Sequence, residues 1–228
     1  MRLRATDAPP TWPDPEGAAH EPNGLLAVGG ALNPAWLISA YRHGLFPWFG
    51  VDDPILWWSP DPRGILVPDE FHASRSLHRS IRQQGYHTRI NHCFSSTIDG
   101  CAAPRGIDTG TWITPAMRLA YCALHQLGLA HSIEVYQAQR LVGGLYGVHL
   151  GGVFFAESMF SRQTDASKVA LLALVQLAKD RGIELIDTQM PSPHLASLGA
   201  KSVSRHVFLS VLRRLIDRPM APWPRPAC

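Results

Sequence analysis

The stretch from Ile133 to Gln189 limits the fold more than any other part of the chain. Polar residues 137–140 and the pair Gly151-Gly152 interrupt it, and both are signals for reversals of the chain. Between and around them lie three apolar-rich runs, at residues 133–136, 141–146 and 153–160. The pattern predicts a short antiparallel meander of three strands.

A helix and a fourth strand are expected after the meander. Asp165 or Ser167 can cap the helix, and Gly182 can take the left-handed position that closes it. Its polar side chains fall within an arc of roughly 120°, which leaves an apolar face to cover a sheet. The strand expected at residues 183–189 follows so closely that it should run parallel to residues 153–160, through a right-handed crossover.

This last strand carries polar residues at its end. Because side chains alternate along a strand, Ile183, Leu185, Asp187 and Gln189 share one face, which begins apolar and ends polar. A core strand that ends in this way can open into a functional site. The alternative is that Asp187 only caps a turn.

Glu157 is a second candidate site residue. By the same alternation it shares a face with Val153, Phe155 and Met159, where burial of an unpaired carboxylate would cost several kcal/mol. Glu157 therefore needs a cationic or hydrogen-bond-donating partner. The alternative is that it lies at a strand end and faces water.

These segments resemble those of one protein family. Residues 156–162, 166–168 and 185–189 are similar, in this order, to segments of the leucyl/phenylalanyl-tRNA–protein transferases. So many ordered, unusual strings are far more specific than a single glycine motif, and the resemblance covers nearly the whole chain. Its other segments are residues 24–30, 44–49, 53–63, 110–114, 131–135, 141–148 and 196–200.

An α+β fold in two parts is expected from the order of elements and the resemblance. The chain has 228 residues, of which 46% are hydrophobic and 17% charged, enough for a small and a medium domain. Proline density over residues 47–68 places the expected seam at residues 60–62. We expect a small aromatic-rich N-terminal domain at residues 1–62. Residues 63–228 should form a catalytic domain like the GNAT acetyltransferases, with a mixed sheet flanked by helices.

The composition argues against a membrane protein and against a metal protein. No apolar run approaches the ~20 residues needed to span a bilayer, so a cytoplasmic location is the default expectation. The four cysteines are widely spaced without a CxxC pair, and the 11 histidines show no HExxH spacing. We therefore expect no metal centre, and we expect a monomer.

A basic helix is the clearest candidate for contact with nucleic acid. Arg75, Arg79 and Arg82 recur at helical spacing after the expected N-cap Ser74, and Gly85 ends the segment. A stripe of this kind can follow phosphates, although a solvated helix face is the commoner explanation. The net charge of the chain is only +3, so local clustering has to supply a tRNA surface. The family resemblance favours tRNA.

Two tryptophans are candidates for stacking. Trp48 lies in an aromatic-rich part of the first 62 residues, and Trp112 lies in a later loop. Core packing explains most of the aromatics. Stacking of Trp48 or Trp112 on the terminal adenosine of a tRNA would contribute ~1–3 kcal/mol per base.

The resemblance implies an activity and three site residues. The family moves leucine or phenylalanine from aminoacyl-tRNA to the α-amino group of proteins that begin with Arg or Lys, which marks them for degradation. An aminoacyl ester is already activated, so no cofactor is expected. Glu157 matches the carboxylate that holds the donor's α-ammonium group, and Asp187 and Gln189 match the pair at the reacting centre. Asp187 is the better proton or charge partner, because the amide of Gln189 can only position a group.

An apolar pocket is needed to select leucine and phenylalanine. Met159, Phe155 and Leu172 could line it, although core packing is expected for at least one of them. One departure from the family lies after Gln189, where family members tend to have an asparagine and an aspartate. This chain has Ser192 between two prolines, which replaces an amide only in part as a hydrogen-bond partner.

Two other functions fit parts of the pattern. An acetyl-CoA-dependent acetyltransferase shares the order of elements, but residues 162–168 lack the glycines that would let backbone amides hold a pyrophosphate. A non-catalytic module that recognises basic N-termini would have acidic binding residues. Such a module has no use for a basic surface of tRNA size, or for Asp187 and Gln189 together in a cleft.

Overall fold

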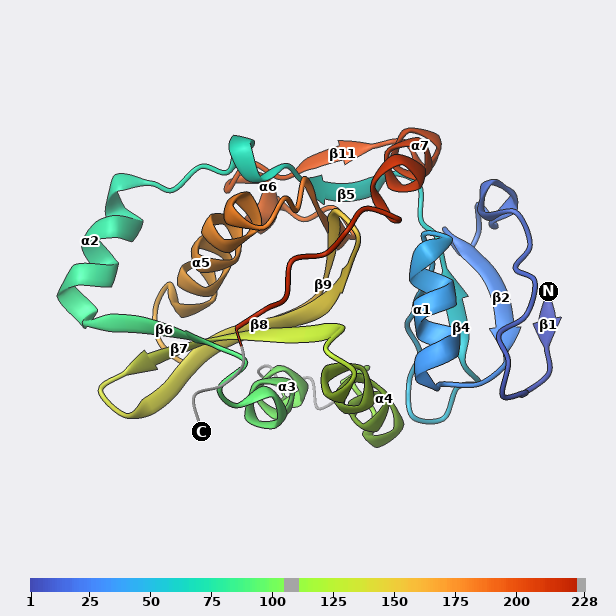
Figure 1. Cartoon of the computed structure of the whole chain (residues 1–228), viewed down its shortest axis with the longest axis horizontal. Helices are drawn as coiled ribbons and strands as arrows, with labels where there is room; N and C mark the ends of the chain where they lie inside the picture. The colour runs from blue at the N-terminus through green and yellow to red at the C-terminus, as the bar shows by residue number, and fades with distance from the viewer. Residues whose placement is uncertain (105–110, 225–228) are drawn as a thin grey trace.

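The computed structural model describes residues 1–104 and 111–224. Its elements form two sheets, a small one at the N-terminal end and a large one that fills the rest of the molecule (Figure 1). In the part of the chain described, no helix is both long and apolar enough to cross a membrane.

The small sheet has four strands in the order β1-β2-β4-β3. Asn33 caps the helix that packs on it, accepting a hydrogen bond from the backbone N–H of Trp36, and Pro34 occupies the first turn. The rings of Trp12, Trp36 and Trp57 pack together in its core. The elements are β1 (Arg2–Leu3), η1 (Pro15–Gly17), β2 (Leu25–Gly29), α1 (Pro34–Arg42), β3 (Phe46–Pro47) and β4 (Leu56–Trp58).

The large sheet has seven strands in the order β11-β5-β10-β9-β8-β7-β6. Its centre is the expected meander, in which β7, β8 and β9 are antiparallel, and β10 lies parallel to β9. The strands are β5 (Arg63–Leu66), β6 (Tyr86–Ile90), β7 (Ala130–Gln137), β8 (Arg140–Leu150), β9 (Val153–Ser161), β10 (Leu185–Gln189) and β11 (Lys201–Val203). The mixed sheet confirms the predicted α+β class, and the parallel pairing of β10 with β9 confirms the predicted direction of the fourth strand.

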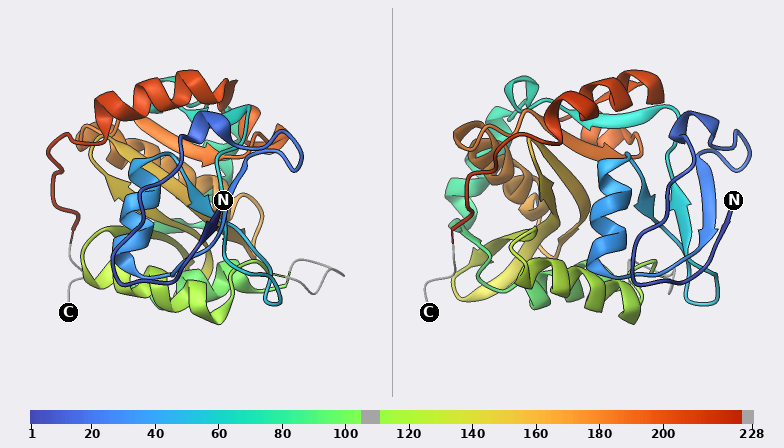
Figure 2. Two further views of the ribbon diagram at one scale, coloured as in Figure 1. Left: turned by 90° about the vertical axis from the view of Figure 1, so that its right-hand side faces the viewer. Right: turned by 45° about the vertical axis from the view of Figure 1, so that its right-hand side comes forward.

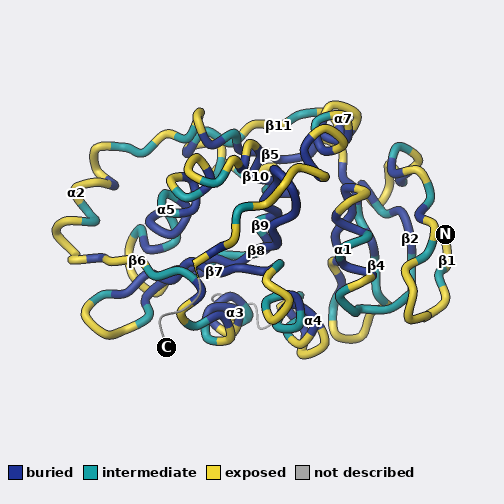
Figure 3. The backbone as a smooth tube through the Cα atoms, viewed as in Figure 1, coloured by how far each residue is buried: buried dark blue, intermediate teal, exposed yellow. Residues whose placement is uncertain are grey.

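Helices cover both faces of the large sheet. One face packs against α5, and the other packs against α3, α4 and α7 (Figures 1 and 3). The crossover helix begins after Asp165, which has a left-handed backbone with φ of 65°, and Gly182 closes the turn after it with φ of 68°. The helices are η2 (Pro68–Glu70), α2 (Arg75–Gln84), α3 (Phe94–Ala102), α4 (Pro115–Gln126), α5 (Ala166–Asp180), α6 (Pro193–Ala196) and α7 (Arg205–Leu215).

The two sheets share one hydrophobic core. Tyr41 from α1 packs its ring against Phe155 of β9, with 4.8 Å between ring centroids. In Figure 2, α1 lies between α7 above and α4 below, and the small sheet lies on the outer side of α1 (Figure 1). The chain passes from the small to the large sheet between Trp58 and Arg63, and we keep residues 60–62 as the proposed domain boundary.

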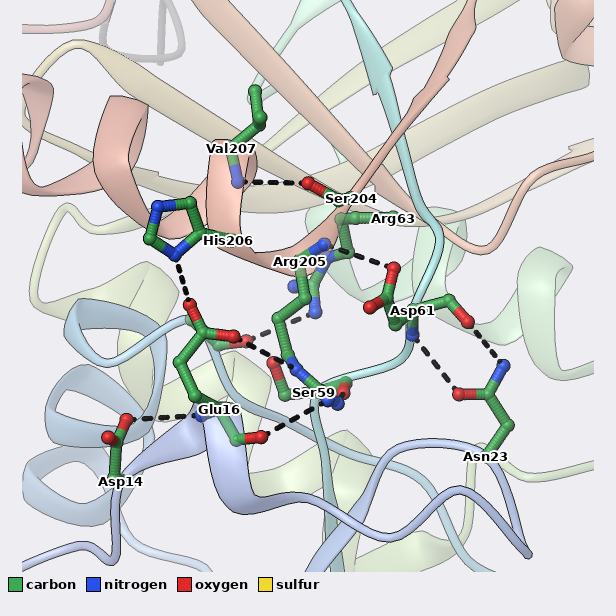
Figure 4. Close-up of polar contacts among 11 residues, drawn as sticks. Asp14, Glu16, Asn23, Ser59, Asp61, Arg63, Ser204, Arg205, His206 and Val207 are labelled. Atoms are coloured by element: carbon green, nitrogen blue, oxygen red, sulfur yellow. Dashed lines mark hydrogen bonds and ion pairs between the residues drawn. The ribbon is translucent and has the colours of Figure 1, made fainter.

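Polar contacts hold this passage in place (Figure 4). The buried guanidinium of Arg205 donates to the Ser59 carbonyl at 2.6 Å and lies 3.7 Å from the Glu16 carboxylate. The backbone N–H of Arg205 donates to the Asp61 carboxylate, and the Asp61 N–H donates to the Asn23 side chain. The start of α7 is thereby tied to the N-terminal segment, which fixes the small sheet beside the ends of β9 and β10.

Candidate active site

Glu157 lies at an irregularity of β9. Tyr146 of β8 pairs with Ser158 and the next residue, Gly147, pairs with Ala156, so Glu157 is the extra residue of a β-bulge. The bulge turns the strand about its axis and interrupts the alternation of its side chains. As a consequence the expectation that Met159 shares a face with Glu157 is wrong, because Met159 packs on the α5 side of the sheet.

Glu157 is 7% exposed, and its carboxylate has the donating partners that this burial requires. The hydroxyl of Tyr121 on α4 donates to one oxygen at 2.7 Å, and the Gln189 side-chain amide donates to the other at 2.7 Å. The Tyr121 hydroxyl also lies 2.7 Å from the hydroxyl of Tyr41 on α1. The carboxylate is thus held from three elements, β10, α4 and α1.

Burial raises the pKa of Glu157 to about 7, although hydrogen bonds from Tyr121, Tyr41 and Gln189 act in the opposite direction. Burial also raises the pKa of the Tyr41 and Tyr121 hydroxyls well above 10, so both remain protonated donors near neutral pH. A buried carboxylate of this kind is suited to bind a cation, because the positive charge would lower its pKa again and favour the ionised form.

We expect this burial to make stability depend on pH. The pKa of Glu157 is about 7 in the fold against 4.5 for an exposed glutamate, so the folded state holds the proton more tightly. The contribution to the free energy of unfolding is therefore greatest below pH 4.5 and is lost as pH rises to about 7, by ~3 kcal/mol in all. Urea denaturation of the wild type and of Glu157→Gln at pH 5 and pH 8 measures this. Equal pH slopes for the two proteins would contradict it.

Asp187 lies in β10, two residues before Gln189. Its side chain is 0% exposed and forms a two-point ion pair with Arg63 of β5, in which Nε and Nη2 donate at 2.9 and 2.6 Å. Arg63 is also fully buried, between the rings of Phe46 and Phe208 at 4.9 and 4.3 Å, and it donates to the Gly44 carbonyl. The sequence pattern did not single out Arg63, although a buried aspartate requires such a partner.

The Asp187 carboxylate also fixes the backbone of Gln189. It accepts the Gln189 N–H at 2.9 Å, and Gln189 has a left-handed backbone with φ of 62°. The pairing of β10 with β5 slips between Asp187 and Gln189, which makes Thr188 an extra residue. This local conformation directs the Gln189 side chain to Glu157.

An open aromatic pocket of about 350 Å³ lies in front of Glu157 and Gln189. Its rim carries Trp48, which is 51% exposed and whose carbonyl accepts a hydrogen bond from the Trp58 indole. The structure therefore brings the two predicted stacking residues together, from positions far apart in the chain. The described lining is Asn23, Phe46, Pro47, Trp48, Trp58, Pro60, Trp112, Glu157, Gln189 and Met190.

A smaller pocket of about 220 Å³ adjoins the first and shares Trp112, Glu157 and Gln189 with it. Its other described lining residues are mostly apolar: Leu145, Ala156, Ser158, Met159, Leu171, Thr188 and Leu195. Met159 lines this pocket. Phe155 and Leu172 are not among its described lining. Phe155 packs on Tyr41, and Leu172 is a half-buried residue of α5 that packs against the core under that helix.

The other predicted contacts lie outside these two pockets. Ser192 caps α6, since its hydroxyl accepts the N–H of Leu195. Arg75, Arg79 and Arg82 are exposed on α2, at the end of the molecule opposite the small sheet (Figures 1 and 3). Ser74 caps that helix and Gly85 closes it with φ of 63°, as predicted.

Together these features define a class of protein. A carboxylate suited to an ammonium group and an amide suited to a carbonyl or an amine face two pockets, one aromatic and one aliphatic. This arrangement suits an enzyme that orients two substrates for group transfer, because it presents charge and hydrogen bonds at the junction of two binding pockets.

Comparison with known proteins identifies the family. The family described as leucyl/phenylalanyl-tRNA protein transferase matches residues 65–213, and its N-terminal domain matches residues 30–61. A leucyl/phenylalanyl-tRNA–protein transferase of Pseudomonas aeruginosa is 55% identical over 91% of this chain and 92% of its own length. One from Shewanella woodyi is 54% identical over 92% and 89%. The chain belongs to this family of aminoacyltransferases, as the sequence resemblance predicted.

Solved structures provide a more distant comparison. L-PGS from Bacillus licheniformis is 12% identical, with a TM-score of 0.42, and the match covers 75% of this chain and 57% of that one. A GCN5-related N-acetyltransferase from Kribbella flavida is 11% identical, with a TM-score of 0.40, over 75% and 62%.

Proposed function

We propose that the chain transfers leucine or phenylalanine from aminoacyl-tRNA to the α-amino group of acceptor proteins that begin with Arg or Lys, marking them for degradation in the cytoplasm. The observation that carries this proposal is the contact between Glu157 and Gln189 where the two pockets meet. An aminoacyl-adenosine has three parts, a cationic amine, an aliphatic or aromatic side chain and a base. The site offers a matching surface for each.

The donor amino acid enters the smaller pocket. Its side chain contacts Leu145, Met159 and Leu171, and its α-ammonium group binds Glu157. The adenosine then lies in the larger pocket, where Trp48 or Trp112 stacks on the base. An apolar pocket selects side chains by size, and about 220 Å³ accommodates both leucine and phenylalanine.

The reaction is aminolysis of the ester. The acceptor nitrogen attacks the carbonyl carbon, the carbon–oxygen bond to the ribose breaks, and the amine proton leaves with the ribose oxygen. Gln189 positions the ester, and orientation alone can lower the barrier by ~7–11 kcal/mol. Asp187 is buried and paired with Arg63, so we assign it the role of positioning Gln189. We assign proton transfer to the ribose hydroxyl next to the ester.

The two parts of the chain differ in net charge, which favours a different substrate on each side of the molecule. Residues 1–62 contain seven acidic and three basic side chains, whereas residues 63–228 contain 11 acidic and 18 basic ones. A cationic acceptor terminus is therefore favoured on the side of the small sheet. The tRNA is favoured on the side of the large sheet.

A transfer assay tests the proposal. Labelled leucyl-tRNA and acetyl-CoA are offered as alternative donors to peptides that differ only in their first residue, Arg, Lys or Ala. We expect leucine transfer to the Arg and Lys peptides and no acetylation. Acetylation without leucine transfer would favour an acetyltransferase, and tight binding of the Arg peptide without transfer would favour a recognition module.

Contact of tRNA with α2 predicts a change in salt dependence. Replacement of Arg75, Arg79 and Arg82 by alanine should weaken tRNA binding and reduce the slope of log K against log salt, by ~0.9 for each duplex phosphate that the variant no longer neutralises. Titration of labelled tRNA at four salt concentrations measures the slope. Wild-type slopes in the triple variant would mean that this helix face is only solvated.

A further inference from the structure

A third cavity lies beyond the apolar pocket, on the other side of Met159. Its volume is about 640 Å³, and it lies between the end of α3, the end of β9, the first turn of α5 and α6. Met159 lines both this cavity and the apolar pocket, so the two are neighbours. The activity proposed above makes no use of this cavity.

An anchored arginine forms part of its wall. The Arg162 guanidinium lies over the Phe160 ring at 5.1 Å and donates to the Leu141 carbonyl at 3.3 Å, yet the residue is exposed. A guanidinium has five N–H donors in one plane, and a side chain that is already oriented loses less entropy when it binds. Arg162 is thus arranged to bind a planar or tetrahedral oxyanion.

The other polar groups of the cavity leave Arg162 as its main donor to an anion. His194 lies exposed on α6 and lines the cavity. The Ser161 hydroxyl is already occupied, because it donates to the Gln163 carbonyl at 2.7 Å and accepts the backbone N–H of Ser167 at 3.3 Å. The carboxylate of Asp165 is nearby, but it is paired with Lys168 at 2.8 Å. With that pair neutralised, Arg162 leaves the cavity positively charged.

The turn beside this cavity contacts the strand that follows the basic helix α2. Tyr86, which follows the glycine that closes α2, donates its hydroxyl hydrogen to the Thr164 carbonyl at 2.8 Å. Thr164 belongs to the turn between Arg162 and α5. Four features therefore follow one another along the large sheet: the exposed arginines of α2, this turn, the cavity and the apolar pocket.

We propose that this cavity binds a phosphodiester of the single-stranded 3′ end of aminoacyl-tRNA, with Arg162 as the principal contact. The assignment rests on the activity proposed above, which supplies a donor that carries phosphates. A cationic acceptor terminus would be repelled here. A phosphate backbone is attracted, and it has to reach the active site from the basic side of the molecule.

The test compares two donors in the full-length protein. Leucyl-tRNA carries the phosphates, and 3′-O-leucyl-adenosine carries none. In Arg162→Ala we expect the KM for leucyl-tRNA to rise about tenfold, the effect of losing one charge-assisted hydrogen bond. Transfer from leucyl-adenosine should stay at the wild-type rate. The salt slope of tRNA binding should fall by ~0.7, the value for one phosphate of a single strand.

Two further variants are controls. Arg162→Lys keeps the charge and should recover part of the affinity, whereas Arg4→Ala removes an exposed arginine from the N-terminal segment and should change neither donor. Equal losses with both donors, or no loss with either, would overturn the assignment of the cavity. A wild-type protein that transfers leucine from neither donor would overturn the proposed activity, and this assignment with it.

Discussion

Glu157→Ala is expected to lower kcat/KM for leucine transfer by roughly 10²- to 10³-fold, the loss typical of truncating one partner of a buried charge pair. The Glu157 carboxylate is held by the donors Tyr121 and Gln189. The described lining of the two pockets contains no other acidic side chain that could bind the α-ammonium group. Single-turnover transfer from labelled leucyl-tRNA measures the change.

A matched control is Glu157→Gln, which keeps the size of the side chain and removes its charge. We expect transfer to remain low in this variant while its stability at pH 8 rises, because burial of the charge raises the pKa of Glu157. Near-normal transfer by Glu157→Gln would show that the charge of this carboxylate is not needed.

Arg63→Ala is expected to destabilise the fold by ~3–5 kcal/mol, because it leaves the Asp187 carboxylate buried without its ion pair. It also removes the donor to the Gly44 carbonyl and the cation between two phenylalanine rings. Urea denaturation measures the free energy of unfolding. A loss below about 1 kcal/mol, the range of exposed ion pairs, would contradict the buried pair.

The double variant Arg63→Met, Asp187→Leu separates stability from positioning. Replacing both charges by apolar side chains of similar volume should recover most of the stability. The Gln189 N–H would still lack its acceptor, so we expect kcat to remain reduced, by roughly 10²-fold, with the KM for leucyl-tRNA unchanged. Recovery of kcat together with stability would show that the pair only supports the fold.

The central architecture could be predicted from the sequence because its signals are local. Each signal lies within a few residues: the apolar runs of the meander, the ends of α5 and the short link to β10. Asp165 occupies the N-cap position of α5, but its side chain makes no capping hydrogen bond. The strand expected from Ile183 begins at Leu185. The strand begins two residues later than expected because its parallel pairing with β9 starts at Leu185.

The local geometry of the site could not be predicted in the same way. A β-bulge depends on the partner strand, so the extra residues Glu157 and Thr188 cannot be recognised in their own strands. The bulge in β9 is the reason why alternation failed to place Met159. The need for a donor to Glu157 was predicted, but Tyr121 is 36 residues away and only the packing of α4 brings it there.

The most direct test of the proposed donor site is a crystal structure with a non-hydrolysable leucyl-adenosine, in which an amide replaces the ester. We predict that the α-ammonium group lies within hydrogen-bonding distance of Glu157 and that the leucine side chain lies beside Met159 and Leu171. The adenine should stack on Trp48 or Trp112. Binding of the analogue with its ammonium group away from Glu157, or its leucine outside that pocket, would contradict the account.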